Sequence, residues 1–157
     1  MSMNEVVDWL TATALSQTIQ TTSWAIPGIQ VVHIVCLAIL FSLALSFSLR
    51  IAGRGFAVEP LASVAARFVP AMWICLVVLL ISGALLIIAE PFRTITNPVF
   101  YLKMTLLVVA IAVTVWLAAV ARRPVEKPTV VHVAGATLGM LVWAGIIIAG
   151  RYIAYVD

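Results

Sequence analysis

The sequence predicts an all-α integral membrane protein, an antiparallel four-helix bundle preceded by a short N-terminal interfacial amphipathic helix. The first observation is composition: 64% of the 157 residues are hydrophobic and 10% are charged, whereas soluble domains carry about 25% charged residues. The second is the length of the apolar runs, each near the ~20 residues that a helix needs to cross a bilayer. We therefore expect a single four-span membrane domain over residues 1–157, with spans at about 28–49, 70–89, 99–121 and 129–149.

The segment before the first span is amphipathic. One helical side of residues 2–20 can hold the apolar residues Val6, Val7, Leu10, Ala14 and Leu15. Most polar residues of the segment lie off that side, which is typical of a helix lying in the membrane interface. Trp24 then marks the headgroup level, and Pro27 lies near the start of the first span.

Proline and charge delimit the other spans. Residues 61–68 predict a helix that leads into the second span, where Pro70 marks a kink or a fresh helix start. The second span ends at Glu90, and Lys103 lies in the first turns of the third. A charged turn over residues 121–128 separates the third span from the fourth.

The basic residues are divided unevenly between the two sides of the membrane. An even number of spans places both termini on one side, and the positive-inside rule makes the more basic side cytoplasmic. We therefore expect a multi-pass protein of the bacterial inner (plasma) membrane with both termini periplasmic. The basic residues on the side opposite the termini are Arg50, Arg54, Arg67, Arg122, Arg123 and Lys127. Those on the side of the termini are Arg93, Lys103 and Arg151. Because they are split between loops, they form no continuous face for nucleic acid.

Small residues recur in the spans and allow helices to approach closely. Gly135 and Gly139 form a G-x-x-x-G pair in the fourth span. Such a pair can pack within the bundle or form a seam between two copies of the chain, and both interpretations stay open. Three kinds of partner are considered for the chain. They are the lipid bilayer, a second copy through Gly135 and Gly139, and a periplasmic or membrane protein.

Two histidines lie near the starts of spans, His33 in the first and His132 in the fourth. These spans begin on opposite sides of the membrane, so the helical rise separates the two imidazoles by about 18 Å along the membrane normal. One haem iron cannot bridge that distance, and His132 is interpreted as an interfacial residue near the cytoplasmic loop. His33 lies deeper and must find a partner within the protein, because lipid offers none.

Polar residues of the other three spans share the depth of His33. We expect a polar cluster in the periplasmic half of the bundle, made of Glu90, Arg93, Lys103, Trp143 and Arg151, with Met104 beside it. Charges at such depth are functional candidates. The alternative is a structural clasp, in which Glu90 pairs with Lys103 or Arg93 and His33 bonds to a nearby carbonyl.

Several motifs follow one another in a characteristic order. His33 precedes Asn97-Pro98-x-Phe100-x-x-Lys103, which opens the third span, and Gly150-Arg151-Tyr152-Ile153-Ala154-Tyr155 closes the fourth. With this layout the chain resembles, over nearly its whole length, an uncharacterised family of bacterial four-helix membrane proteins known only as a domain of unknown function.

The layout is more distantly similar to the copper-resistance D family and to the HemJ-type protoporphyrinogen oxidases. That resemblance implies haem b, with His33 and Lys103 in the places of the family's functional pair, and Met104 is a further candidate haem ligand. The chain lacks HemJ's aromatic-Leu-Pro-Arg stretch after the first span and its Asn-Glu-Val-Pro segment near the end, which argues against protoporphyrinogen oxidation.

Three functions stay open. The first is a non-catalytic membrane subunit or scaffold whose polar cluster docks a periplasmic partner. The second is a b-type haem protein, an electron carrier or oxidase, with His33 as axial ligand. The third is a transporter of a small solute or metal, although no span is visibly broken at the membrane midplane. The motifs of nucleotide-binding, zinc-protease and thiol-redox enzymes do not occur, and the scattered methionines form no metal ligand set.

Overall fold

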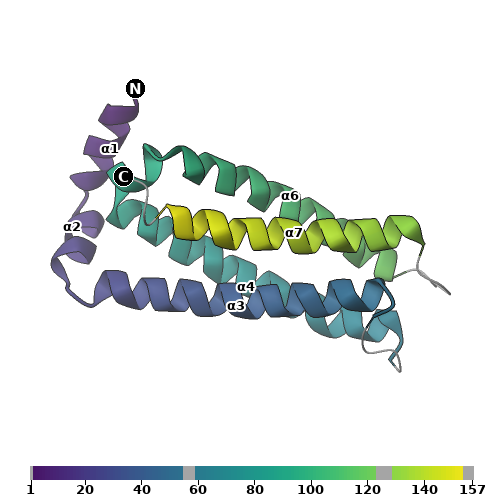
Figure 1. Ribbon diagram of the computed structural model, residues 1–157. Helices are drawn as coiled ribbons and strands as arrows, with labels where there is room; N and C mark the ends of the chain where they lie inside the picture. The colour runs from purple at the N-terminus through teal and green to yellow at the C-terminus, as the bar shows by residue number, and fades with distance from the viewer. Residues whose placement is uncertain (1, 55–58, 123–128, 154–157) are drawn as a thin grey trace.

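The computed structural model describes residues 2–54, 59–122 and 129–153, and nearly all of these are helical (Figure 1). The four long helices are α3 (Ala25–Ile51), α4 (Leu61–Ala89), α6 (Pro98–Ala121) and α7 (Val130–Tyr152). Each is long and apolar enough to cross a membrane, so the chain is a multi-pass membrane protein. The predicted all-α four-helix bundle is confirmed.

The second of these helices begins nine residues before the predicted span. α4 is one continuous helix that contains Pro70, so neither a fresh start nor a separate lead-in helix forms there. A proline removes one intrahelical hydrogen bond. The turns before it are held by burial, because Val64 and Ala65 pack in a core cluster with Phe47 and Ile51 of α3.

The N-terminal segment forms two helices where one was expected, α1 (Met3–Thr11) and α2 (Ala14–Thr21). The break has a local cause at Thr13, whose backbone is extended and whose side chain accepts a hydrogen bond from Ser16 N at 3.3 Å. A threonine in this conformation starts a new helix as its N-cap. Figure 1 shows α1 and α2 lying across one end of the bundle.

α2 is attached to the bundle through the end of α4. Ser16 Oγ donates to the carbonyl oxygen of Ile88 at 2.7 Å, and Gln20 Nε2 donates to that of Ala89 at 2.8 Å. The last carbonyls of a helix have no partner within it. The two side chains therefore cap α4, and Ser16 is fully buried in doing so.

The long helices pack as two pairs. α3 lies mainly against α4 and α6 mainly against α7, and the pairs join along α3 and α7. α4 and α6 have few contacts with each other. The bundle is therefore closed on the side of α3 and α7 and looser between α4 and α6.

A short helix, α5 (Pro91–Ile95), and loop segments complete the end that carries α1 and α2. α5 follows α4 directly, and Asn97 then caps α6 by accepting from Val99 N at 2.9 Å. The same end holds the start of α3 and the end of α7 (Figure 1). All four long helices thus contribute a terminus to it.

The glycine pair of α7 faces other helices of the same chain. A Cβ built on Gly135 would lie 2.2 Å from Cζ3 of Trp116, and one on Gly139 would lie 3.3 Å from Cγ1 of Val113. Both neighbours are on α6, so the pair makes room for packing within the bundle. Association of two copies through Gly135 and Gly139 stays a prediction.

We expect Gly135→Ala to lower the thermal stability of the protein. The added methyl forces Trp116 to move, and overpacking of this kind costs about 1–3 kcal/mol, more than the ~1 kcal/mol that alanine gains over glycine in a helix. Gly145→Ala is the matched control, because its Cβ would lie 3.4 Å from the nearest side-chain atom, Cδ1 of Leu106. Thermal unfolding in detergent should show a lower midpoint for the first variant only; equal midpoints would contradict the packing assigned to Gly135.

Candidate functional site

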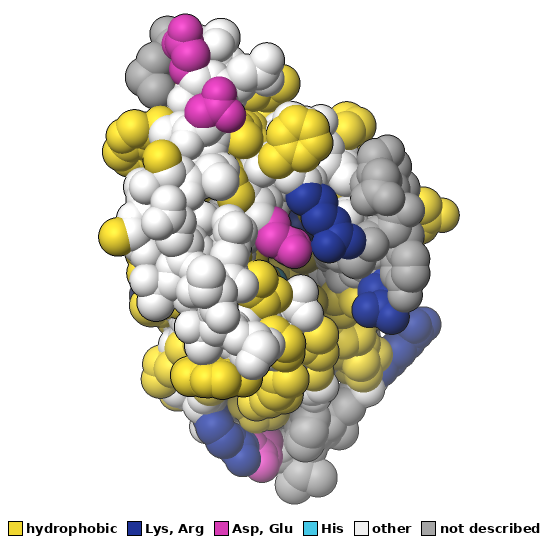
Figure 2. All heavy atoms as spheres, turned by 90° about the vertical axis from the view of Figure 1, so that its left-hand side faces the viewer, with side chains coloured by type: hydrophobic (Ala, Val, Ile, Leu, Met, Phe, Trp, Pro, Cys, Tyr) yellow, Lys and Arg dark blue, Asp and Glu magenta, His cyan; other side chains and the backbone are white. Residues whose placement is uncertain are grey.

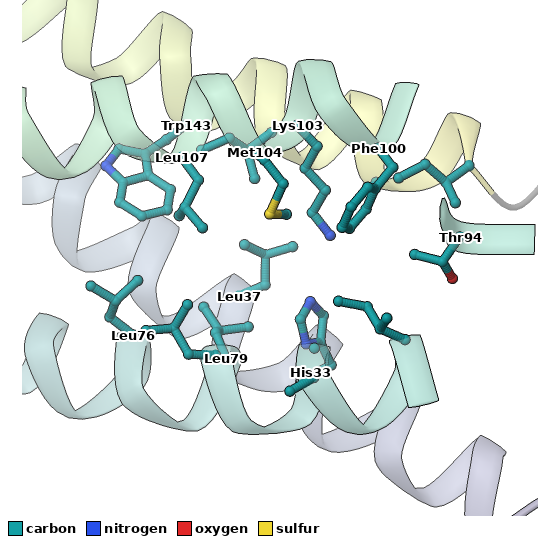
Figure 3. A pocket seen from close by; sticks show the side chains of 17 residues that line it. His33, Leu37, Leu76, Leu79, Thr94, Phe100, Lys103, Met104, Leu107 and Trp143 are labelled. Carbon is teal, nitrogen blue, oxygen red and sulfur yellow. The ribbon is translucent and has the colours of Figure 1, made fainter. Parts of the chain in front are cut away.

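A cavity of about 360 Å³ lies between the two helix pairs, toward the end that carries α1 and α2 (Figure 3). It occupies the region where α4 and α6 are loosely packed. Its walls are mostly aliphatic, formed by Leu37, Leu76, Leu79, Leu80, Gly83, Ala84, Ile87, Leu107, Ile146, Gly150 and Ile153. The other lining residues are His33, Thr94, Phe100, Lys103, Met104 and Trp143.

His33 projects from the third turn of α3 and is held by α4. Its Nδ1 lies 2.8 Å from Ser82 Oγ, and this hydroxyl lies 2.7 Å from the carbonyl oxygen of Val78. A hydroxyl has one proton to donate. Because the Ser82 proton goes to the Val78 carbonyl, we assign the imidazole proton to Nδ1, which donates to Ser82. The partner of His33 is therefore a hydroxyl of the neighbouring helix, and the expected bond to a carbonyl is not what forms.

The other ring nitrogen of His33 is directed at the cavity (Figure 3). With the proton on Nδ1, Nε2 carries an unprotonated lone pair. A fixed imidazole with a free lone pair can accept a proton or a hydrogen bond, or bind a metal.

Lys103 reaches the cavity from the opposite wall. It lies in the second turn of α6, and Figure 3 shows its ammonium directed toward His33. Within the described residues Lys103 forms no ion pair or hydrogen bond. It lies near the C-terminal end of α7, where the helix dipole favours a cation.

Two glycines give these side chains their space. A Cβ on Gly83 would lie 3.5 Å from Cε1 of His33, and a Cβ on Gly150 would lie 3.5 Å from Nζ of Lys103. Each of these two side chains thus lies against the bare backbone of the neighbouring helix. A larger residue at either position would narrow the cavity at its polar end.

Met104 and Trp143 extend the site away from Lys103. The Met104 thioether faces the cavity from α6, and Trp143 forms its deeper wall (Figure 3). The indole is 3% exposed. Of the predicted residues, the structure thus brings His33, Lys103, Met104 and Trp143 to one cavity.

The other predicted residues lie outside the cavity, on the end face of the bundle. Glu90 pairs with Arg93 at 3.4 Å, and both side chains are 40% exposed. Arg151 is exposed one residue beyond the cavity-lining Gly150. Figure 2 shows this end of the molecule, with an acidic side chain next to basic ones near its centre. Of the two ion pairs considered for Glu90, the structure contains the one with Arg93. The predicted polar cluster is therefore divided between the end face of the bundle and the cavity, which Lys103 and Trp143 line.

His132 lies at the far end of the bundle. It is the third residue of α7, and its Nδ1 accepts from Thr129 N at 3.3 Å as part of a capping box. His132 therefore has a structural role at the start of α7, and it does not share a site with His33.

Ser82 is the site residue that the sequence did not single out for chemistry. It stands in a Ser-Gly-Ala stretch whose small residues indicate close packing. The sequence could have indicated Ser82 as the partner of His33, because it places a hydroxyl on the second span at the depth of a histidine that requires a partner.

Comparison with protein-family models finds no match to the chain, and comparisons with curated proteins and solved structures find none either. The resemblance to the four-helix family therefore stays a prediction, and the site is interpreted from its own geometry.

We expect Lys103→Met to leave the thermal stability of the protein without a ligand unchanged or to raise it. Among the described residues the ammonium stands in a largely apolar wall without a counter-ion, and methionine replaces it with an uncharged chain of similar length. Glu90→Gln serves as the control, because a half-exposed ion pair contributes about 0–1 kcal/mol. Thermal melts of the two variants test this. A loss on the order of 3–5 kcal/mol for Lys103→Met, the usual effect of breaking a buried pair, would show that Lys103 belongs to a clasp.

Proposed function

We propose that this membrane protein binds haem b in the cavity, with Nε2 of His33 as an axial ligand. The observation that carries the proposal is the hydrogen-bond chain from His33 Nδ1 through Ser82 to the Val78 carbonyl. Metal-binding histidines almost always donate their second ring N–H to a fixed acceptor, which sets the tautomer and the ring orientation. Here that arrangement leaves the coordinating nitrogen facing the cavity.

The residues around the cavity fit this group. A haem brings four nitrogen ligands of its own and requires one or two from the protein, so a single imidazole is a sufficient anchor. The cavity of about 360 Å³ has mainly aliphatic walls, and sites for small molecules and cofactors commonly measure about 300–1,000 Å³.

The opposite wall supplies two further groups. Met104 offers a thioether, the second axial ligand of cytochromes c, and Lys103 offers a cation that can pair with a haem propionate. When bound, haem supplies one-electron chemistry, which makes electron transfer along or across the membrane the proposed activity. The resemblance to haem-containing four-helix families supports the same assignment of His33 and Lys103.

A Soret band in protein purified from haem-replete cells is the expected result. His33→Ala should abolish the band while the helical circular dichroism is retained, because the axial ligand is lost. Ser82→Ala should weaken haem retention by about 10–100-fold, the usual effect of removing the acceptor behind a metal-binding histidine. His132→Ala, which alters the histidine at the far end, should keep the full band.

Two outcomes would refute the haem proposal. One is a wild-type protein without Soret absorbance, and the other is a band that persists in His33→Ala. The function would then be that of a membrane subunit, docking a periplasmic or membrane partner through the end face that carries Glu90, Arg93 and Arg151. The specific observation behind this second candidate is that these charges lie on the surface at the end of the bundle.

We further propose that the cavity end faces the periplasm and that the protein lies in the bacterial inner membrane. Arg50, Arg54, Arg67 and Arg122 lie at the end of the bundle opposite α1 and α2, while Arg123 and Lys127 lie outside the described residues. Basic residues of short loops favour the cytoplasm. Both termini are then periplasmic.

Cysteine labelling tests the orientation. In a background without Cys36 and Cys75, we expect an impermeant maleimide to label Asn4→Cys in spheroplasts and to leave Arg54→Cys unlabelled. Permeabilised membranes provide the control, because both positions should then react. Labelling of position 54 and protection of position 4 in intact spheroplasts would reverse the proposed topology without bearing on haem.

A further inference from the structure

The interior of the bundle holds a second polar site, deeper than the ligand cavity and separated from it by Trp143. We propose that one water molecule binds there, accepting a hydrogen bond from Trp143 Nε1 and donating to the hydroxyl oxygens of Ser48 and Thr114. This site joins α3, α6 and α7, and it does not depend on the identity of the ligand in the larger cavity.

The first observation is the indole nitrogen of Trp143. The side chain is 3% exposed, and its Nε1 is buried without a hydrogen-bond partner among the described residues. Figure 3 shows this nitrogen turned away from His33 and Lys103, toward the middle of the bundle. Buried tryptophan N–H groups usually find an acceptor, and in the bilayer core lipid offers none.

The second observation is a pair of hydroxyls that do not bond to their own helices. Ser42 on α3 and Thr105 on α6 donate to carbonyls one turn back, at 2.8 and 3.0 Å. Ser48 and Thr114, on the same two helices, have no hydrogen bond within the described part of the chain, although they are 2% and 9% exposed. Their oxygens are therefore available as acceptors.

The third observation is a small cavity that these groups share. Ser48, Thr114 and Trp143 line a space of about 10 Å³ whose other walls are apolar. A space of roughly 10–15 Å³ is the least that holds one water, which also needs two to four polar partners. The backbone leaves this room at Gly139, where a Cβ would lie 3.9 Å from Ser48 Oγ.

Water is the ligand that fits the chemistry of the three groups. An indole N–H can only donate, and a hydroxyl oxygen accepts through its lone pairs. A water molecule accepts from the first and donates its two protons to the others, which gives each of the three groups a hydrogen-bond partner. It would also fix the plane of Trp143, whose opposite side forms the deeper wall of the ligand cavity.

NMR of protein with ¹⁵N-labelled tryptophan, in nanodiscs, tests the site. The chain has five tryptophans, and Trp143→Phe identifies the Nε1–H signal of Trp143; single Phe variants of the other four assign it by elimination if that variant does not fold. We expect this buried proton to show cross-relaxation to water in the wild type. The cross-peak should be lost in Thr114→Val and kept in Thr114→Ser, the matched control that retains the hydroxyl.

Gly139→Ala gives an independent arm of the test, because its methyl group intrudes on the small cavity while every polar partner is kept. Loss of the water cross-peak in this variant and in Thr114→Val supports the site. A wild-type Trp143 signal without cross-relaxation to water would overturn the proposal. A cross-peak that survives both Thr114→Val and Ser48→Ala would overturn it as well, since the water would then have other partners.

Discussion

Lipid supplies no hydrogen-bond partners, and the bond between His33 and Ser82 is how this bundle meets that constraint for its cavity histidine. The bond joins α3 to α4 at 2.8 Å, next to the cavity. It also determines which ring nitrogen stays free, because Ser82 commits its own proton to the Val78 carbonyl. The chemical character of the cavity, a directed lone pair in an apolar space, follows from this single contact.

The same constraint explains the arrangement of the end face. The last carbonyls of α4 would be unsatisfied at the membrane boundary, and Ser16 and Gln20 of α2 cap two of them. α2 is therefore held across the end of the bundle next to α4. The N-terminal segment thus completes the bundle, in addition to presenting exposed apolar side chains such as Trp9 and Leu15 that suit the membrane interface.

The sequence was sufficient for the helices and for depth along the membrane normal, because hydropathy gives each span and a constant rise per residue gives each position. It was insufficient for rotation about the helix axes, since these spans are apolar on nearly all sides and carry little directional pattern. Depth alone placed Lys103 at the level of His33, while its pairing with His33 was expected from the family resemblance. The missing rotation is why Glu90 was expected nearer the interior. The break at Thr13 and the continuous α4 through Pro70 depend on capping and burial that hydropathy does not report.

Arg93 and Lys103, two basic residues at this end of the bundle, have different surroundings, and the difference bears on whether the cavity takes a ligand. Arg93 satisfies its charge on the surface with Glu90, whereas Lys103 extends into the cavity opposite an imidazole that is itself a base. The neutral imidazole has no charge to offset that of Lys103, and no hydrogen bond joins the two groups within the described residues, so both are poorly solvated in the apolar space. An occupant that accepts from Lys103 and binds the lone pair of His33 removes both costs together. The arrangement is therefore complementary to a ligand with an anionic group and an electrophilic centre, two properties that haem combines in its propionates and its iron.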